Sequence, residues 1–322
     1  MIRIFAAVAG LIHVLLAAPV FAQEPWPSRP VKFVVPSSPG GGTDTYARLL
    51  AQALSDSLKR QFIVENRPGA SGNIGADIVA KSAPDGYTFL LSANPALTVN
   101  PSLYKNLSYN VERDFVPVAR GVVAPQVLVV ASSVPAKTMA EFIALAKREP
   151  GKLAYGSAGS GSTTYLGVRI LEEASGAKFL HIPYKGMGQA YQDLLGGQLK
   201  FMFPDVASVL GHIKSGKAVP LAVTERTELL PGVPTFAEAG LPGVDATSSF
   251  SVVAPTGTPA AIVQRLSAEI NKAMKSPALA EKLQAQALNA VFDTPEQFAV
   301  SLKKERDGWA AFIKRNGIVL EE

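Results

Sequence analysis

The stretch VKFVVPSSPGGGTDTYARLL, residues 31–50, decides the fold. Its first five residues are β-branched or aromatic apart from Lys32 and predict a buried strand, and the glycines that follow predict a tight loop. Beyond the loop, Tyr46, Leu50 and Leu54 recur at helical spacing and predict an amphipathic helix. The stretch is therefore a strand–loop–helix unit, which is typical of α/β proteins.

A second stretch repeats this pattern 119 residues later. The sequence GGGTDTY at 40–46 and the sequence GSGSTTY at 159–165 agree at four of seven positions, and LAY at 153–155 precedes the second copy. Each copy lies between a predicted strand and a predicted helix. This placement is expected if two α/β lobes each present one strand-to-helix loop.

Further apolar runs alternate with helical patterns along the chain. This alternation is that of βαβ units and predicts an α/β fold. The runs are rich in β-branched and aromatic residues and predict strands at 87–91, 127–130, 179–182, 199–203, 219–223 and 250–254.

Composition excludes several classes of protein. The 322 residues include no cysteine, which excludes disulfides, thiolate metal sites and a cysteine nucleophile. Only three histidines are present, so we expect no histidine-based metal site and no cofactor. The net charge is +5, and the basic residues are scattered without a long run, which argues against nucleic-acid binding.

The amino-terminal residues 1–22 have the features of a secretory signal peptide. Arg3 precedes a largely apolar run, and VFA at 20–22 places small residues at positions −3 and −1. The run is short for a membrane span and is interrupted by His13 and Pro19. We therefore expect cleavage after Ala22 and a mature protein that is exported to the periplasm.

The two glycine- and serine-rich loops have a common chemical capacity. The first backbone N–H groups of a helix lack partners within the helix, and the helix dipole makes that end positive. A loop of small residues lets a carboxylate approach these groups. Two such loops facing each other can hold a small anion without arginine, although glycine and serine also occur where a chain simply turns tightly.

Motifs for catalysis are incomplete. The run at 211–218 resembles a nucleotide-binding P-loop, but Ala218 stands where a serine or threonine must bind magnesium. No Gly-x-Ser-x-Gly sequence is present, and only His181 and His212 remain for a catalytic triad in the mature chain. Hydrolase activity is therefore not expected.

A series of longer motifs runs along the mature chain. The motifs are VVPSSPGG at 34–41, VENRPGA at 64–70, GNIG at 72–75, PDGYT at 84–88, NPSLY at 100–104, PYKG at 183–186, DLLGG at 193–197, PGVPTFAEAG at 231–240 and APTGTP at 254–259. With these motifs in this order, the chain resembles the Bug receptors, the TctC-like substrate-binding proteins of tripartite tricarboxylate transporters. The resemblance covers essentially the whole mature chain up to Trp309.

The resemblance implies an α/β, two-lobed periplasmic binding protein of type II-like fold. Each lobe is expected to hold a mixed sheet flanked by helices, with the ligand cleft between the lobes. The chain is expected to cross twice, with lobe 1 at 23–124 and 249–322 and lobe 2 at 125–248. The implied function is that of a monomeric receptor, without catalytic turnover, that delivers a small organic carboxylate to a membrane permease.

The resemblance also implies which residues hold the ligand, largely through backbone amides, hydroxyls and waters. In many family members an acidic residue follows Met-Phe directly, whereas here Pro204 intervenes and the acid is Asp205. Asp205 either pairs with an amino group of the ligand or turns away and favours a plain dicarboxylate. The expected ligand-binding residues are Ser38, Gly40, Gly41, Thr43, Asp44, Ser92, Ala93, Asn94, Ser157, Gly159, Ser160, Ser162, Thr163 and Asp205.

Two other functions remain open at this point. The protein is alternatively a ligand sensor that presents a carboxylate to a sensor kinase, or an exported enzyme of the same fold. Tyr46 and Tyr165, one turn into the helices, either line the ligand site or pack in the cores.

Overall fold

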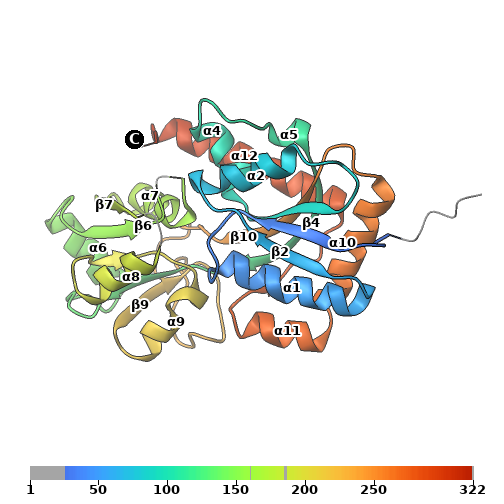
Figure 1. The fold of residues 1–322 in the computed structure, drawn as a ribbon. Helices are drawn as coiled ribbons and strands as arrows, with labels where there is room; N and C mark the ends of the chain where they lie inside the picture. Colours follow the sequence, from blue (N-terminus) through green and yellow to red (C-terminus); the bar gives the residue numbers. More distant parts are fainter. Residues whose placement is uncertain (1–25, 160, 185–186, 321–322) are drawn as a thin grey trace, which may run out of the picture.

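The computed structural model describes residues 26–159, 161–184 and 187–320. Two β-sheets, each with helices packed against it, form two lobes that lie side by side (Figure 1). The predicted signal peptide lies outside the described residues. Among the described residues, no helix is both long enough and apolar enough to span a bilayer, and no cluster of acidic or histidine side chains is arranged to hold a metal ion.

The sheet of lobe 1 has six strands and is mixed. β1 pairs in parallel with β2 and β3, whereas β10 pairs antiparallel with both β3 and β4. In spatial order the strands are β11 (Asn289–Ala290), β4 (Phe115–Ala124), β10 (Ser248–Pro255), β3 (Thr88–Ala93), β1 (Val31–Val35) and β2 (Phe62–Asn66).

Helices cover both faces of this sheet. Successive side chains of a strand point to opposite faces, so Phe33 of β1 belongs to the core under α1, α10 and α11, and Val34 belongs to the core under α2 and α12. The helices are α1 (Gly42–Leu58), the short turn η1 (Ala70–Gly72), α2 (Asn73–Ala80), α3 (Pro95–Thr98), α4 (Asn100–Leu103), α5 (Val111–Asp114), α10 (Ala260–Met274), α11 (Pro277–Gln284) and α12 (Pro295–Arg315).

The sheet of lobe 2 has five strands and is also mixed. β6 pairs in parallel with β7 and β8, and β5 pairs antiparallel with β8 and β9. The strands in spatial order are β7 (Leu180–Pro183), β6 (Ala154–Ser157), β8 (Phe201–Met202), β5 (Val127–Ala131) and β9 (Ala218–Val223). The helices are α6 (Met139–Arg148), α7 (Thr163–Ser175), α8 (Met187–Leu195) and α9 (Val206–Lys214).

Both strand-to-helix loops of interest follow a strand at which the sheet order reverses. β1 lies between β2 and β3, and β6 lies between β7 and β8. In an open α/β sheet, a crevice forms at such a switch point outside the carboxyl ends of the strands. The topology therefore places both loops where ligands bind in folds of this class.

The chain passes between the lobes at two places. β4 ends at Ala124 and β5 begins at Val127, and β9 ends at Val223, ahead of β10 at Ser248. The two connections contact each other through a hydrogen bond of 3.2 Å from the Gln126 amide to the Ser248 hydroxyl. The lobe boundaries at 124/125 and 248/249 stay a prediction.

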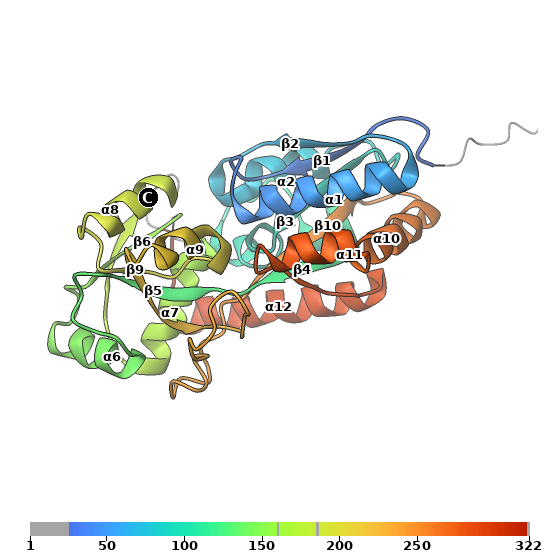
Figure 2. The same cartoon turned by 90° about the horizontal axis from the view of Figure 1, so that it is seen from below.

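Helix α12 spans both lobes (Figure 2). Near its start, Phe298 and Leu302 pack in the core of lobe 1, whereas Phe312 and Ile313 pack in the core of lobe 2. At its end, Arg315 forms an ion pair of 2.9 Å with Glu173 of α7. The last turns of the chain thus belong to the packing of lobe 2, although the rest of α12 covers lobe 1.

Candidate functional site

The loop between β1 and α1 is held by a buried carboxylate. Asp44 is only 3% exposed and accepts hydrogen bonds of 2.9 Å from the Gly40 amide, the Arg48 guanidinium and the Asn66 amide. Burial opposes ionisation of Asp44, but these donors outweigh it and hold the pKa of the carboxyl below its usual value. Asp44 therefore shapes the loop, and ligand contact by Asp44 stays a prediction.

The amino terminus of α1 is open to an anion. Its N-cap residue, Gly41, is extended, and no side chain within the described part of the chain caps the helix. Gly40 and Gly41 are exposed beside it, as is Ser38, whereas Thr43 is buried. The uncapped N–H groups and the positive end of the helix dipole give this loop the chemistry expected from its sequence.

The loop between β6 and α7 is shaped by hydroxyl groups. The Ser162 hydroxyl donates to the Gly159 carbonyl at 2.6 Å and accepts from the Tyr165 amide at 3.3 Å, so it caps α7. Ser157 is fully buried, and its hydroxyl lies 2.7 Å from the His181 imidazole. Thr163 opens the helix and is half-buried, and the predicted ligand residue Ser160 lies outside the described residues.

The two lobes meet at this second loop. A side chain on Gly161 would lie 3.3 Å from Oδ1 of Asn100 and 3.6 Å from Oγ of Ser71, both in lobe 1. Asn100 Oδ1 is buried without a hydrogen-bond partner among the described residues. Ser71 and Asn100 thus face the lobe 2 loop, although neither was among the expected ligand residues.

The backbone around Ser71 has an unusual conformation. Ala70 and Ser71 have φ angles of 47° and 53°, between Gly69 at 127° and Gly72 at 92°. Residues other than glycine rarely adopt positive φ, and such strain is found at functional sites. The motifs VENRPGA and GNIG flank this turn and are the sequence signal from which it could have been found.

Asp205 lies at the boundary between the lobes. It precedes α9 without capping it, and its Oδ2 atom is buried with no hydrogen-bond partner in the described chain. A side chain on Gly42, in the first turn of α1, would lie 3.7 Å from that atom. The carboxylate of lobe 2 is therefore turned towards the open helix terminus of lobe 1, not away from it.

Side chains at the end of β3 connect this strand to neighbouring elements. The Asn94 amide donates to Glu305 of α12 at 2.6 Å, and its oxygen accepts from Ser251 at 2.9 Å. The Ser92 hydroxyl donates to the adjacent carbonyl of Ala93. These side chains tie β3 to β10 and α12, and ligand contact by Ser92, Ala93 and Asn94 remains a prediction.

The aromatic residues behind the two loops pack in the cores. Tyr46 is fully buried and Tyr165 is 6% exposed. The Tyr46 hydroxyl donates to the sulfur of Met274 at 3.7 Å. Of the two alternatives for these tyrosines, core packing is the one the structure shows.

Comparison with known families places the chain among transporter receptors. The family described as "Tripartite tricarboxylate transporter family receptor", TctC, matches residues 46–318. Protein BugT of Bordetella pertussis is 40% identical over 323 residues, which cover 99% of this chain and 97% of BugT. The resemblance inferred from sequence motifs is confirmed.

Two solved structures with small carboxylates are similar to this chain. Rpa4515 of R. palustris, described as with adipate, has a TM-score of 0.86 and 34% identity and covers 91% of this chain and 99% of its own. MatC of Rhodopseudomonas palustris, described with bound malate, has a TM-score of 0.81 and 30% identity and covers 89% and 100%. These similarities confirm the two-lobed binding-protein fold, and the family description confirms a receptor rather than an enzyme.

Proposed function

Because the chain belongs to the tripartite tricarboxylate transporter receptor family, we propose that it binds a small organic carboxylate between its two lobes. The ligand carboxylate contacts the uncapped first turn of α1 in lobe 1. The loop of lobe 2 ahead of α7 completes the site from the other side. A ligand that contacts both lobes favours the arrangement in which they meet, which is the form that a permease recognises.

A single observation supports this proposal most strongly. Loops at the switch points of two separate sheets lie at one lobe boundary, where Gly161 approaches Asn100 and Gly42 approaches Asp205. The relatives described with adipate and with malate are carboxylate-bound members of the same fold. Dicarboxylates of about this size are therefore the first candidates for the ligand.

Asp205 narrows the choice of ligand. A buried carboxylate oxygen without a donor is costly, and a hydrogen-bond donor on the ligand would satisfy it. The ligand we expect thus carries an ammonium or hydroxyl group near the carboxylate that contacts α1. Malate or aspartate is expected to bind more tightly than succinate, and the Asp205→Asn variant should reduce that preference.

The remaining parts of the proposal concern the context of binding. We propose that the mature protein begins after Ala22, acts as a monomer in the periplasm and delivers its ligand to the permease of a tripartite transporter. Lobe 1 comprises 23–124 and 249–322 and lobe 2 comprises 125–248 in this proposal, with the end of α12 reaching from lobe 1 to pack on lobe 2. Uptake of the ligand by cells that lack the protein would test the link to transport against the alternative of a sensor.

The direct test is thermal denaturation of the mature chain with adipate, malate, succinate, aspartate and benzoate. At a hundredfold excess over the dissociation constant, a ligand adds about 2.7 kcal/mol to the free energy of unfolding. We expect a rise in melting temperature of about 5 °C for the acids that bind. Dimethyl adipate, which lacks both charges, is the control and should have no effect.

Two outcomes would contradict the proposal. In one, the ester stabilises the protein as much as the acid, which would mean that the helix terminus does not bind an anion. In the other, no acid changes the melting temperature and mass spectrometry of the denatured protein finds no co-purified carboxylate.

A further inference from the structure

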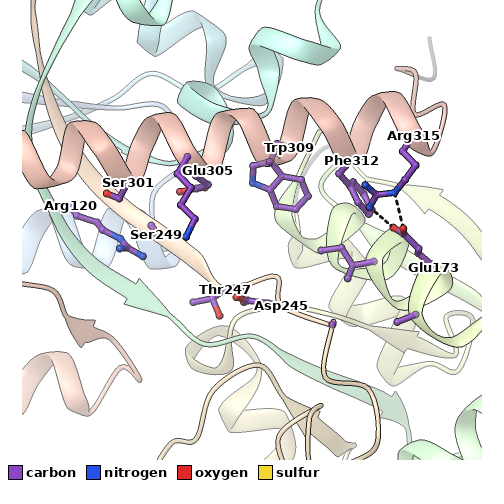
Figure 3. Close-up of a pocket in the computed structure, with 15 residues that line it drawn as sticks. Arg120, Glu173, Asp245, Thr247, Ser249, Ser301, Glu305, Trp309, Phe312 and Arg315 are labelled. Atoms are coloured by element: carbon purple, nitrogen blue, oxygen red, sulfur yellow. Dashed lines mark hydrogen bonds and ion pairs between the residues drawn. The ribbon is translucent and has the colours of Figure 1, made fainter.

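A cavity of about 810 Å³ lies beside α12 (Figure 3). Its walls include Arg120 of β4, Thr247 in the second connection between the lobes, Glu173 of α7, and Lys304 and Trp309 of α12. None of the residues expected to bind the carboxylate lines it. The volume lies within the range of small-molecule sites, so the cavity is large enough for a second ligand.

The acidic side chains of the cavity already have partners. Glu173 accepts hydrogen bonds from Arg315 at 2.9 Å and from Asn316 at 3.1 Å, and Asp245 accepts from the Thr247 amide at 3.1 Å. The charge of Glu173 is therefore balanced by Arg315, and Asp245 accepts a backbone hydrogen bond within its own turn.

Glu305 is also engaged. It accepts hydrogen bonds from the Asn94 amide at 2.6 Å and the Thr98 hydroxyl at 3.2 Å. Burial raises the pKa of the Glu305 carboxyl. The hydrogen bonds of the Glu305 carboxyl thus go to Asn94 and Thr98, on the lobe 1 side of α12.

Two basic side chains of the cavity lack such partners. In the ranges that the structure describes, neither Arg120 nor Lys304 forms a hydrogen bond or an ion pair, and Arg120 acts on Glu305 only through its charge. The Arg120 guanidinium points into the cavity (Figure 3). The cavity therefore offers two cationic donors to an anion.

An apolar wall lies next to these cations. The ring of Trp309 projects from α12 into the cavity (Figure 3), and Phe312 packs edge-on against it with ring centroids 5.7 Å apart. A flat apolar group can stack on the exposed face of the indole. From the cations and this wall together, we propose that the cavity is a second ligand site for an aromatic carboxylate.

The proposed second site is lined by residues of both lobes, so a ligand there would affect how the lobes are placed relative to each other. Arg120 belongs to lobe 1, Glu173 belongs to lobe 2, and α12 packs on both. A ligand that binds the cavity as it stands in this structure stabilises these relative positions of the two lobes over other positions. If a carboxylate between the loops favours the same arrangement, each ligand increases the affinity of the protein for the other. This consequence rests on the proposed function.

The test uses 4-nitrobenzoate as the probe, because nitroaromatic groups quench tryptophan fluorescence. The chain has two tryptophans, so the Trp26→Phe background leaves Trp309 as the reporter. In that background we expect saturable quenching, weakened about tenfold by Lys304→Met and by Arg120→Met. Lys303→Met is the matched control, since Lys303 pairs with Asp307 outside the cavity and should leave the affinity unchanged.

The proposal is overturned if 4-nitrobenzoate does not quench Trp309 or if Lys304→Met and Lys303→Met have equal affinity. It is also overturned if Gly42→Ala, in the first turn of α1, abolishes quenching while Lys304→Met does not, because the probe then binds between the loops. The quenching is measured without any other ligand. Failure to find a carboxylate for the loops therefore leaves this test intact.

Discussion

The loops before α1 and before α7 have similar sequences but are built in different ways. The loop of lobe 1 relies on the buried carboxylate of Asp44, which accepts hydrogen bonds from Gly40, Arg48 and Asn66, and it leaves its helix uncapped. The loop of lobe 2 relies on hydroxyl groups, and Ser162 caps its helix.

This difference shows that a matching pattern of glycines and hydroxyls does not predict whether the following helix is capped. Both loops precede a helix, but only the first leaves the helix N–H groups without a side-chain acceptor. An uncapped terminus is the stronger anion site, because a capping hydroxyl already satisfies one of the free donors. We therefore expect the two loops to differ in what their substitutions change.

The largest expected effect is on the stability of lobe 1. Asp44→Ala removes the acceptor of three hydrogen bonds, two of them from uncharged amides, and is expected to lower the free energy of unfolding by about 3 kcal/mol. Urea denaturation would measure it. Asp56→Ala lies on the exposed face of the same helix, where Gln52 alone among the described residues bonds to the carboxylate, and should cost under about 0.5 kcal/mol. Equal losses for both variants would show that Asp44 does not hold the loop.

The charge of Asp44 is expected to matter in a pH-dependent way. Because the pKa of the folded carboxyl lies below its unfolded value, ionised Asp44 stabilises the protein at neutral pH, and this stability is lost as the pH falls through the folded pKa. Asp44→Asn should therefore cost about 1.5 kcal/mol at pH 7 and progressively less below about pH 4. Urea denaturation of both proteins across this range is the measurement. A difference that stays constant in acid would exclude the charge as its cause.

Affinity is expected to depend on the first turn of α1. A methyl group at Gly42 would lie 3.2 Å from the ring of Phe250 and 3.7 Å from Asp205, so Gly42→Ala fills the space where the lobes meet. We expect about a tenfold loss of carboxylate affinity, equivalent to about 1.4 kcal/mol, by calorimetric titration. Gly211→Ala in α9 is the control, because its added methyl has no neighbour within 4 Å and Gly211 lies outside both loops. Similar affinities for both variants would mean that the ligand does not need this space.

The smallest effect is expected at the cap of α7. Ser162→Ala removes the hydroxyl that accepts from the Tyr165 amide and should cost about 1 kcal/mol of stability. Ser162→Asp, which restores an acceptor, should recover most of that loss in the same urea experiment. If Ser162→Asp is as unstable as Ser162→Ala, the hydroxyl serves the loop through Gly159 rather than as a cap.

The strands show how far the sequence alone predicts the fold. The run predicted at 31–35 is β1 with the same bounds, and the runs at 127–130 and 219–223 lie within β5 and β9. The ten-residue strand β4 was not predicted, because Pro117, Arg120 and Gly121 interrupt its apolar pattern. These residues lie at or next to the positions where the pairing of β4 with β10 is irregular. The irregularity depends on β10, a strand more than 120 residues further along the chain.

The candidate site was also predictable from the sequence only in part. Short-range patterns predicted the two strand-to-helix loops, since the spacing of glycines and the start of a helix are local properties. The contact of Gly161 with Asn100 and Ser71 was not predictable, because those residues lie in other elements of the other lobe. The same reason applies to Asn94, which follows a strand as expected but bonds to Glu305 from a helix 211 residues further on.

The sequence by itself thus determined the class of fold, the family, and the two loops that each join a strand to a helix, because periodicity, turn residues and long motifs are readable along the chain. Only the tertiary structure decided which of those loops leaves its helix open to an anion and that Asp205 turns towards it. It alone also revealed the cavity beside α12, where Arg120 and Trp309 come together. Such features depend on which distant groups satisfy each polar atom, and a hydrogen-bond partner is chosen in space rather than along the chain.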